Sequence, residues 1–302
     1  MRRLTTTFAA CALALTAIVL ANSATADETE THVLIVVGPS NHPPGSHEVA
    51  AGGRLMQHCL SNANNVGKLK AEIAYEWPKK EEILDRADTV VFIGDTFPPN
   101  RFPGSDAILA KLGSMMNRGC GIVCIHYATG LRAQDVGSKG EHPLLQWMGG
   151  YFATGCPHHQ SIAKIYRDAK IEPAAADHPI SRGWKEFTLH DEPYINNYFG
   201  NDENKLAPNV TALAVSMLPP EKPKREVVSW CVERDDHGRG FGIVMPHFYR
   251  SWKTEDLRTF ILNGIVWTAK RPVPASGVKS DLPELTSFKP ESVEPKARPK
   301  KQ

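Results

Sequence analysis

Two kinds of hydrophobic pattern alternate along the first half of the chain. Short, continuous apolar runs are typical of strands that are buried on both faces of a parallel sheet. These runs lie at residues 32–37, 71–75, 89–93 and 121–125. Between them, residues 48–60 and 106–116 place apolar side chains at helical spacing. Strands alternating with helices predict an α/β sandwich with a parallel sheet and right-handed crossovers.

The pattern changes after Gly150. Residues 151–235 hold short strand candidates among loops that are rich in Pro, Asn and His. These candidates lie at residues 161–166, 211–215 and 227–232. The simpler pattern returns with a strand at 240–245 and a helix at 255–269. We therefore predict an α/β core whose second half is elaborated into loops over one end of the sheet.

The two ends of the chain differ from this core. Residues 1–26 combine Arg2 and Arg3, an uncharged apolar run and small residues before Asp27, which is the order of a signal peptide. The apolar run is shorter than the roughly 20 residues that span a bilayer. We expect an exported protein, periplasmic or secreted, without insertion in a membrane. Residues 271–302 are rich in proline and charge and predict a disordered tail, which leaves one domain at 27–270.

Charge and cysteine content narrow the classes of partner and site. Of the 35 Lys and Arg residues two lie within residues 1–26, which leaves 33 against 33 Asp and Glu. This balance gives no support to a nucleic-acid partner. The five cysteines outside residues 1–26 include no CxxC pair, which argues against a zinc knuckle or a full disulfide framework, although export would permit one bridge. The sequence specifies no oligomeric state.

Polar side chains directly follow the predicted strands, and three of four strand ends supply a histidine. These side chains are His42, His47 and Glu48 after the first strand, Asp95 after the third, His126 and Tyr127 after the fourth, and His247 after the last. Ligands of α/β sheets bind beyond the carboxyl ends of the strands. We therefore predict that His47, His126 and His247 converge on one pocket and are catalytic.

An acidic pair in the later loops completes the predicted site. Asp191 and Glu192 are adjacent in "HDEPY", and neighbouring residues of an extended segment point to opposite sides, so only one of them is expected to face the pocket. The predicted substrate-binding residues are His42, Glu48, Tyr127, His158, Tyr194 and Trp252.

Several of these motifs occur in the order seen in one known family. "GPSNHPPGSHE", "VCIHYA", "HPISRG", "DEPY" and "LNGIVWTA" lie between residues 32 and 269 and resemble the trehalose-utilisation, or ThuA-like, family. The resemblance implies a flavodoxin-like three-layer sandwich similar to class I glutamine amidotransferases, with a nucleophile elbow after the fourth strand. It also implies a role in carbohydrate catabolism, acting on oxidised (3-keto) sugars or glycosides.

The elbow differs from that of an amidotransferase. His126 stands at the turn where amidotransferases carry a cysteine, and Cys124 lies two residues earlier, inside the strand. A thiol packed in apolar surroundings has a raised pKa and is a poor nucleophile. Because glutamine hydrolysis requires an activated thiolate, we predict that Cys124 is structural and that the chain is not a glutamine amidotransferase.

Three functions remain open from the sequence. In the first, one imidazole removes a proton alpha to a sugar ketone while Tyr127 or Tyr194 stabilises the enolate. In the second, His47, His126 and His247 hold a zinc-like divalent metal, although HxH and HExxH spacings are absent. Either would make the chain a keto-sugar isomerase, lyase, hydratase or hydrolase. In the third, aromatic residues such as Trp147 and Tyr151 form a non-catalytic sugar-binding module.

Overall fold

The computed structural model describes residues 30–200 and 203–297. The predicted signal peptide at 1–26 lies outside these residues, as does the end of the predicted tail. Within the described ranges, no helix combines the length and the apolar character that crossing a membrane requires.

Five parallel strands form the first half of the central sheet, in the order β2-β1-β3-β4-β11. Their bounds are β1 Thr31–Val37, β2 Leu69–Ala74, β3 Thr89–Ile93, β4 Gly121–Ile125 and β11 Arg239–Ile243. All five side chains of β3 and of β4 are buried, because helices cover both faces of these strands. The predicted α/β fold with a parallel sheet is therefore confirmed for this half.

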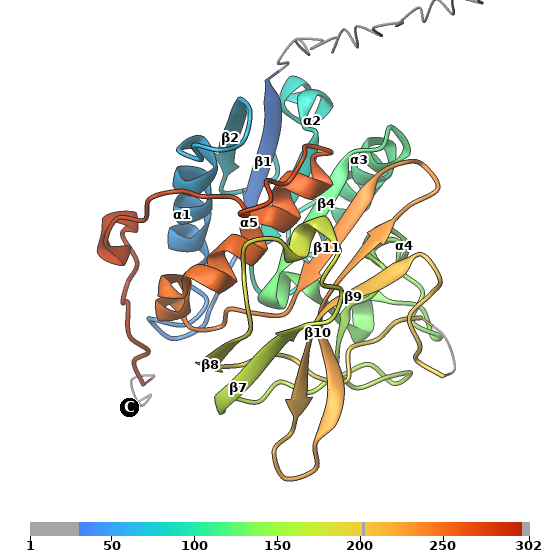
Figure 1. Cartoon of the computed structure of the whole chain (residues 1–302). Coiled ribbons are helices and arrows are strands. Elements are labelled where there is room, and N and C mark those ends of the chain that lie inside the picture. Colours follow the sequence, from blue (N-terminus) through green and yellow to red (C-terminus); the bar gives the residue numbers. More distant parts are fainter. Residues whose placement is uncertain (1–29, 201–202, 298–302) are drawn as a thin grey trace, which may run out of the picture.

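Helices pack on both faces of the sheet (Figure 1). α1 (Val49–Ser61) and α5 (Glu255–Thr268) contact each other and cover one face, whereas α3 (Ser105–Asn117) and α4 (Pro143–Met148) pair on the other, together with the short α2 (Glu81–Arg86). α1 lies close to β1 because Gly53 has no side chain: a Cβ there would be 2.8 Å from Cγ2 of Val37. This packing fixes the start of α1, and with it the loop that carries His47.

The second half of the sheet is antiparallel, and it corrects the sequence analysis. Four strands continue the sheet beyond β11 in the order β10-β9-β7-β8, which makes nine strands in all. They are β7 Tyr166–Pro173, β8 Phe187–Asp191, β9 Val210–Leu218 and β10 Lys224–Glu233. Residues 151–235 thus add these four strands to the loops that the sequence predicts. The expected strands at 211–215 and 227–232 lie within β9 and β10, whereas the expected strand at 161–166 is wrong, because only Tyr166 belongs to a strand. Buried residues alternate with exposed ones in β8, so the strand lacks a continuous apolar run.

Shorter elements connect these strands and helices. A separate two-stranded sheet pairs β5 (Gly130–Arg132) with β6 (Phe152–Thr154). The 3-10 helices are η1 Pro98–Asn100, η2 His126–Thr129, η3 Ala133–Asp135, η4 Pro179–Ser181, η5 Tyr249–Lys253 and η6 Leu285–Phe288.

The segment predicted to be a disordered tail is packed on the domain as far as residue 297. Val278, Leu285 and Phe288 are buried in the core. The guanidinium of Arg54 in α1 donates hydrogen bonds to the carbonyl oxygens of Phe288 and Lys289. The expectation of disorder is wrong for residues 271–297, because a few well-spaced apolar side chains anchor the segment although its average composition is polar.

Candidate functional site

The three predicted histidines meet at the carboxyl ends of the parallel strands. His47 ends the loop after β1, His126 follows β4 directly, and His247 follows β11. Nε2 of His47 lies 2.9 Å from Nε2 of His126 and 2.9 Å from Nδ1 of His247, and the last two atoms are 3.3 Å apart. Residues far apart in sequence are therefore brought to one point by the sheet, as the strand-end pattern predicts.

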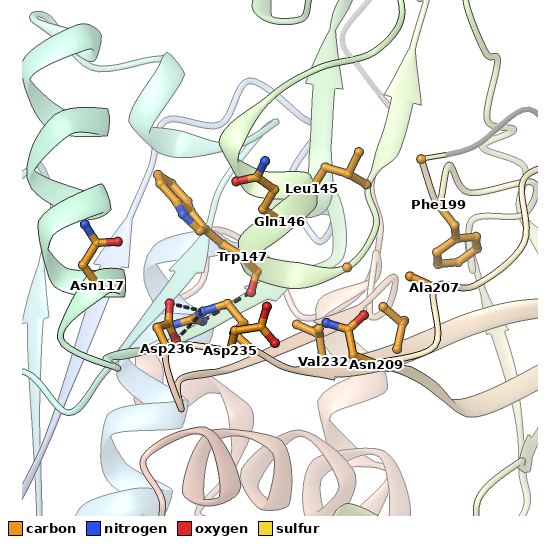
Figure 2. A pocket seen from close by; sticks show the side chains of 14 residues that line it. Asn117, Leu145, Gln146, Trp147, Phe199, Ala207, Asn209, Val232, Asp235 and Asp236 are labelled. Carbon is orange, nitrogen blue, oxygen red and sulfur yellow. Dashed lines mark hydrogen bonds and ion pairs between the residues drawn. The ribbon is translucent and has the colours of Figure 1, made fainter.

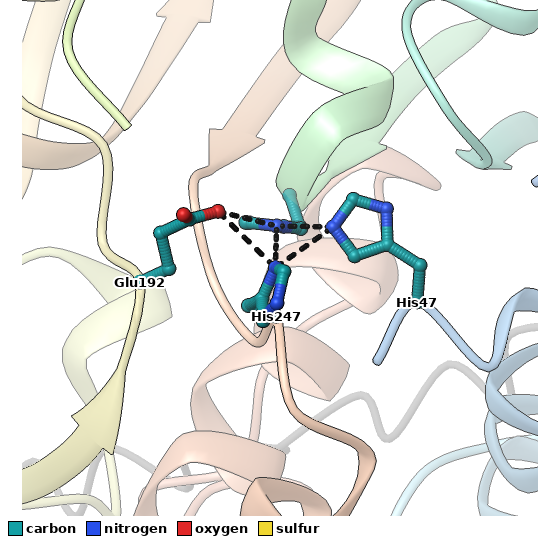
Figure 3. Close-up of side chains that lie close together, drawn as sticks. His47, Glu192 and His247 are labelled. Carbon is teal, nitrogen blue, oxygen red and sulfur yellow. Dashed lines mark hydrogen bonds and ion pairs between the residues drawn. The ribbon is translucent and has the colours of Figure 1, made fainter. Parts of the chain in front are cut away.

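Glu192, which follows β8, supplies a carboxylate to the same point (Figure 3). Its Oε2 lies 3.1 Å from Nδ1 of His247 and 3.9 Å from Nε2 of His126. Figure 3 shows Glu192, His247 and His47 pointing toward one another from different parts of the chain. Three nitrogen atoms and one oxygen atom, all within 4.8 Å of one another, form a set that could hold a metal ion.

The far sides of two of these rings are fixed by hydrogen-bond acceptors. Nδ1 of His47 lies 2.6 Å from Oδ1 of Asp95, and Nδ1 of His126 lies 3.0 Å from the carbonyl oxygen of Val244. An ionised carboxylate and a carbonyl oxygen can only accept, so each Nδ1 carries the proton and donates. In the neutral rings each Nε2 then presents a lone pair to the shared point. A cation placed between such lone pairs would be bound by both, and backing acceptors of this kind are typical of metal-ligating histidines.

Burial keeps the imidazoles of His47 and His126 neutral. Burial lowers the pKa of His47 to about 4, against an opposing effect of the Asp95 hydrogen bond. Burial, followed by the neighbouring imidazoles of His47 and His247, lowers the pKa of His126 well below its usual value. For Asp95 burial alone would favour the neutral acid, but hydrogen bonds from His42 and His47 outweigh it and hold the pKa well below its usual range. The cluster thus combines unprotonated nitrogen atoms with a charged carboxylate behind them.

The backbone at two of the histidines is unusual. His47 has φ of 46° and His126 has φ of 50°, in the left-handed region that residues other than glycine rarely adopt. Such conformations persist only where the surrounding structure enforces them, and they are concentrated at functional sites. The His47 N–H also donates to the carbonyl oxygen of His247 at 2.9 Å, which links the two loops directly.

Asp191 has a different role from Glu192, its neighbour in sequence. The Asp191 side chain is fully buried and accepts hydrogen bonds from the backbone N–H groups of Glu192 and His247, each at 2.7 Å, and from the Ser251 hydroxyl. Burial raises the pKa of Asp191. Asp191 therefore positions the His247 loop from behind, and the prediction that it could itself be catalytic is not supported by its place in the structure.

Three further predicted residues lie around the cluster. His42 stacks on His47 with 3.5 Å between ring centroids, and its Nδ1 lies 2.8 Å from Oδ2 of Asp95. The Tyr194 hydroxyl is 3.0 Å from Nε2 of His126, and the two rings stack. Tyr127 presents its ring to His47 at 5.8 Å between centroids. These side chains can contact a ligand bound at the histidines.

The other predicted binding residues are placed differently. The Glu48 carboxylate accepts hydrogen bonds from the backbone N–H groups of Gly45, Glu291 and Ser292, so it holds backbone. His158 lies apart from the cluster and pairs with the Tyr151 hydroxyl at 2.8 Å. Trp252 is 2% exposed and lines a small cavity beneath the rings. We therefore assign these three residues to support of the fold.

Asp95 is the residue of the candidate site to which the sequence analysis gave no role. The sequence placed it at the end of the third strand, beside three histidine-bearing ends, but gave it no role. Its two oxygen atoms connect His42 and His47. The signal in the sequence was an acidic residue at a strand end, next to strand ends that carry histidines. An acidic residue in such a place can orient a histidine.

Cys124 is fully buried within β4, where burial raises its pKa well above the usual value. All five cysteines in the described residues are free thiols, and all are buried. The Cys124 side chain is therefore placed as the sequence analysis predicted, in the core and behind the turn that carries His126.

A wider groove lies at the other end of the sheet (Figure 2). It has a volume of about 560 Å³, and Asn117 and Asp236, which line it, precede β4 and β11 in the sequence. Trp147 contributes an aromatic side chain. The one buried charge, Arg234, is paired with Asp236 and donates to the carbonyl oxygen of Cys120 at 2.8 Å. The groove thus contains no converging set of unpaired groups.

Comparisons with known proteins agree with this architecture. A family model described as ThuA, trehalose utilisation, matches residues 32–268. The crystal structure of a ThuA-like protein from Bacteroides uniformis superposes with a TM-score of 0.57 at 15% identity, covering 82% of this chain and 94% of that one. A glutamine amidotransferase from Thermotoga maritima gives a TM-score of 0.41 at 10% identity, covering 80% and 97%. No curated protein sequence matches the chain.

Proposed function

The chain belongs to the ThuA, or trehalose-utilisation, family, and from that premise we propose that it is an exported enzyme that acts on oxidised (3-keto) sugars or glycosides with a bound divalent metal. The observation that carries the proposal is the convergence of three imidazole nitrogens and the Glu192 carboxylate on one point. A small-molecule sugar is the proposed partner.

The donor set fits a zinc-like ion. Zinc holds nitrogen ligands at about 2.0 to 2.1 Å, which places tetrahedral ligand atoms about 3.3 Å apart. The nitrogen atoms of the cluster are 2.9 to 3.3 Å apart, close to that spacing. Neutral imidazoles with one carboxylate also suit zinc or a neighbouring transition ion better than calcium or magnesium.

The same distances weigh against acid-base catalysis between the imidazoles. Such a mechanism needs room for the sugar between the proton donor and the proton acceptor. The three nitrogen atoms are within hydrogen-bond reach of one another, and the cavity beneath the rings has a volume of only about 20 Å³, room for about one water molecule. The substrate is therefore expected to approach from the rim formed by His42, Tyr127 and Glu192.

Each residue of the site would have a distinct chemical role. A bound metal supplies a Lewis acid that polarises a sugar carbonyl or activates a water molecule. His47, His126 and His247 would hold the ion, with Asp95 fixing the tautomer of His47. Glu192, whose side chain is 16% exposed and so the least buried of the set, can accept a proton at its carboxylate. The Tyr194 hydroxyl can donate a hydrogen bond to an oxygen at the reacting centre.

The alternative of a non-catalytic sugar-binding module has less support. Sugar rings stack on exposed aromatic faces, but Tyr151, Tyr194 and Trp252 are at most 2% exposed. These rings belong to the hydrophobic core.

A direct test uses the purified mature protein with 3-keto-glucosides. We expect turnover, followed by mass spectrometry, that is lost after chelation and restored by zinc. A Cys124→Ser variant is the control: it should keep its turnover and lose stability at most, because a buried hydroxyl costs more than a buried thiol. Full turnover by metal-free protein would overturn the metal mechanism, and a folded but inactive Cys124→Ser variant would overturn the assignment of the elbow.

A further inference from the structure

The packed C-terminal segment lies outside the family match but next to the candidate site. The match ends at residue 268, whereas the structure continues to residue 297 and leads the chain past α1 toward the loop that carries His42 and His47 (Figure 1). Any role of this segment would thus be a property of this chain in addition to those of the family domain.

The segment is fastened to the histidine-bearing loop by specific contacts. The Glu48 carboxylate accepts hydrogen bonds from the N–H groups of Glu291 and Ser292 at 2.8 and 2.9 Å. The N–H of Lys296 donates to the carbonyl oxygen of Pro44 at 2.9 Å. Gly45 has φ of 85°, and a Cβ there would lie 2.2 Å from the carbonyl oxygen of Glu294, so the close approach requires glycine. These contacts hold the segment in a fixed position beside the loop.

A cavity lies between the segment and the site. It has a volume of about 300 Å³, at the lower end of the range of small-molecule pockets. Side chains from both partners line it, namely Ser40, His42, Ser46, His47, Lys289 and Glu291. One wall therefore belongs to the histidine cluster and the opposite wall to the C-terminal segment.

Lys289 and Glu291 offer free polar groups to this cavity. Within residues 30–200 and 203–297, the Lys289 ammonium and the Glu291 carboxylate have neither a hydrogen bond nor an ion pair. The charges of Lys289 and Glu291 cancel, and serine hydroxyls accompany them. The Glu48 carboxylate also lines the cavity, but it is taken up by backbone N–H groups. Such a lining suits an uncharged ligand that is rich in hydroxyl groups, because lysine donates to hydroxyl oxygens and a carboxylate accepts from hydroxyl protons.

We propose that the C-terminal segment completes the substrate site and that Lys289 and Glu291 bind the sugar unit next to the reacting ring. The chain would then prefer glycosides of two or more units over single sugars. The inference rests on the proposed function for the class of substrate, but it concerns a different set of residues from the metal ligands.

The test compares binding of trehalose and of glucose by isothermal titration calorimetry. We expect the Lys289→Ala/Glu291→Ala double variant to bind trehalose about tenfold or more weakly than wild type, since each lost hydrogen bond to a charged group is worth about 1.5 to 3 kcal/mol. Glucose binding should not change. Lys296→Ala is the matched control, because this side chain lies in the same segment but does not line the cavity. Thermal unfolding of all variants checks that the segment stays packed.

The outcomes separate this inference from the proposed function. Unchanged trehalose binding by the double variant, or no trehalose binding by wild type, would overturn the inference even if 3-keto-glucosides are turned over. A selective loss of trehalose binding in a protein that never turns over a keto-sugar would sustain the inference and overturn the proposed chemistry. Equal weakening by Lys296→Ala would show that the effect is structural, and would also overturn the inference.

Discussion

The histidine cluster and the groove near Trp147 lie at opposite ends of the same sheet. They differ in the volume that they enclose and in how their polar side chains are paired. The cluster encloses little space, and its side chains are almost fully buried, point at one another and are backed by fixed acceptors. The groove encloses far more space, but the side chains of Asn117, Gln146 and Asp235 on its rim form no hydrogen bond or ion pair within the described residues (Figure 2).

The difference teaches that the candidate site of this molecule is marked by the convergence of polar atoms and not by the volume of a cavity. Burying polar groups costs free energy unless they are paired. In the groove the only buried charge, Arg234, is fully paired with Asp236 and carbonyl oxygens. In the cluster, two Nε2 lone pairs face each other at 2.9 Å. Only the second arrangement directs several ligand atoms at one point where a ligand can bind.

The largest effect is expected when one of the converging nitrogen atoms is removed from the cluster. We expect His126→Ala to lose metal binding and to reduce turnover of 3-keto-glucosides by more than about 100-fold, because the metal supplies several kcal/mol of transition-state stabilisation. Metal content measured by mass spectrometry after dialysis and thermal unfolding are the readouts. A folded His126→Ala protein that keeps its metal would contradict the assignment.

His142 tests whether a buried imidazole outside the cluster affects the stability of the fold and not metal binding. It caps the N-terminus of α4, accepting from the N–H of Leu144, and burial lowers its pKa to about 4. The unfolded chain takes up this proton from about pH 6.5 downward and the folded chain only near pH 4, so stability is lost as pH falls between these values. Wild type should lose up to about 3 kcal/mol more than His142→Asn over that window.

Asparagine keeps the capping acceptor, which makes His142→Asn a clean comparison. The measurement is urea unfolding at several pH values with metal-free protein. Parallel pH profiles of wild type and variant would show that His142 does not titrate on unfolding. Metal content of the His142→Asn protein should equal that of wild type.

A substitution of Asp95 tests the hydrogen bonds that orient His42 and His47. Asp95→Asn keeps the shape of the side chain but removes the charge that fixes His42 and His47. We expect metal affinity to fall by about 10 to 100-fold, the usual effect of removing a partner of a metal-ligating histidine. Competition with a chelator of known affinity measures it. Asp235→Asn in the groove is the matched substitution, and an equal loss there would show that general charge and not contact is responsible.

The smallest effects are expected in the groove. Asn117→Ala and Gln146→Ala should change the free energy of unfolding by less than about 0.5 kcal/mol, as is usual for exposed side chains without partners. Turnover and trehalose binding should stay within twofold of wild type. A clear loss of sugar binding in either variant would move the binding function to the groove and favour the binding-module alternative.

The parallel half of the fold and its histidines could be predicted because both follow from local patterns. Continuous apolar runs mark β1, β3 and β4, and the rule that ligands bind beyond carboxyl strand ends then brings His47, His126 and His247 together. The antiparallel half could not be predicted in the same way. Strands such as β8 bury only alternate residues, so their sequences resemble polar loops.

The roles of the remaining residues depend on tertiary contacts. The sequence indicated that one of Asp191 and Glu192 faces the pocket, but the choice depends on how β8 pairs with β7 and where Ser251 lies. Glu48 was read as a binding residue because its partners, Glu291 and Ser292, are more than 240 positions away along the chain. The packing of the C-terminal segment was missed for the same reason, since its anchors meet a surface formed elsewhere.

The distance in sequence between the ligands has a consequence for assembly. His47 and His247 are 200 positions apart and His126 lies between them, so two of these side chains are not held together for chelation before the sheet has formed. An extended chain would have to close long loops to bind, at an entropic cost that weakens capture. A metal would then load only after folding and would favour the native state by mass action, by about 4 kcal/mol at a thousandfold excess over Kd. The melting temperature would rise with metal concentration and so report whether the ion is present.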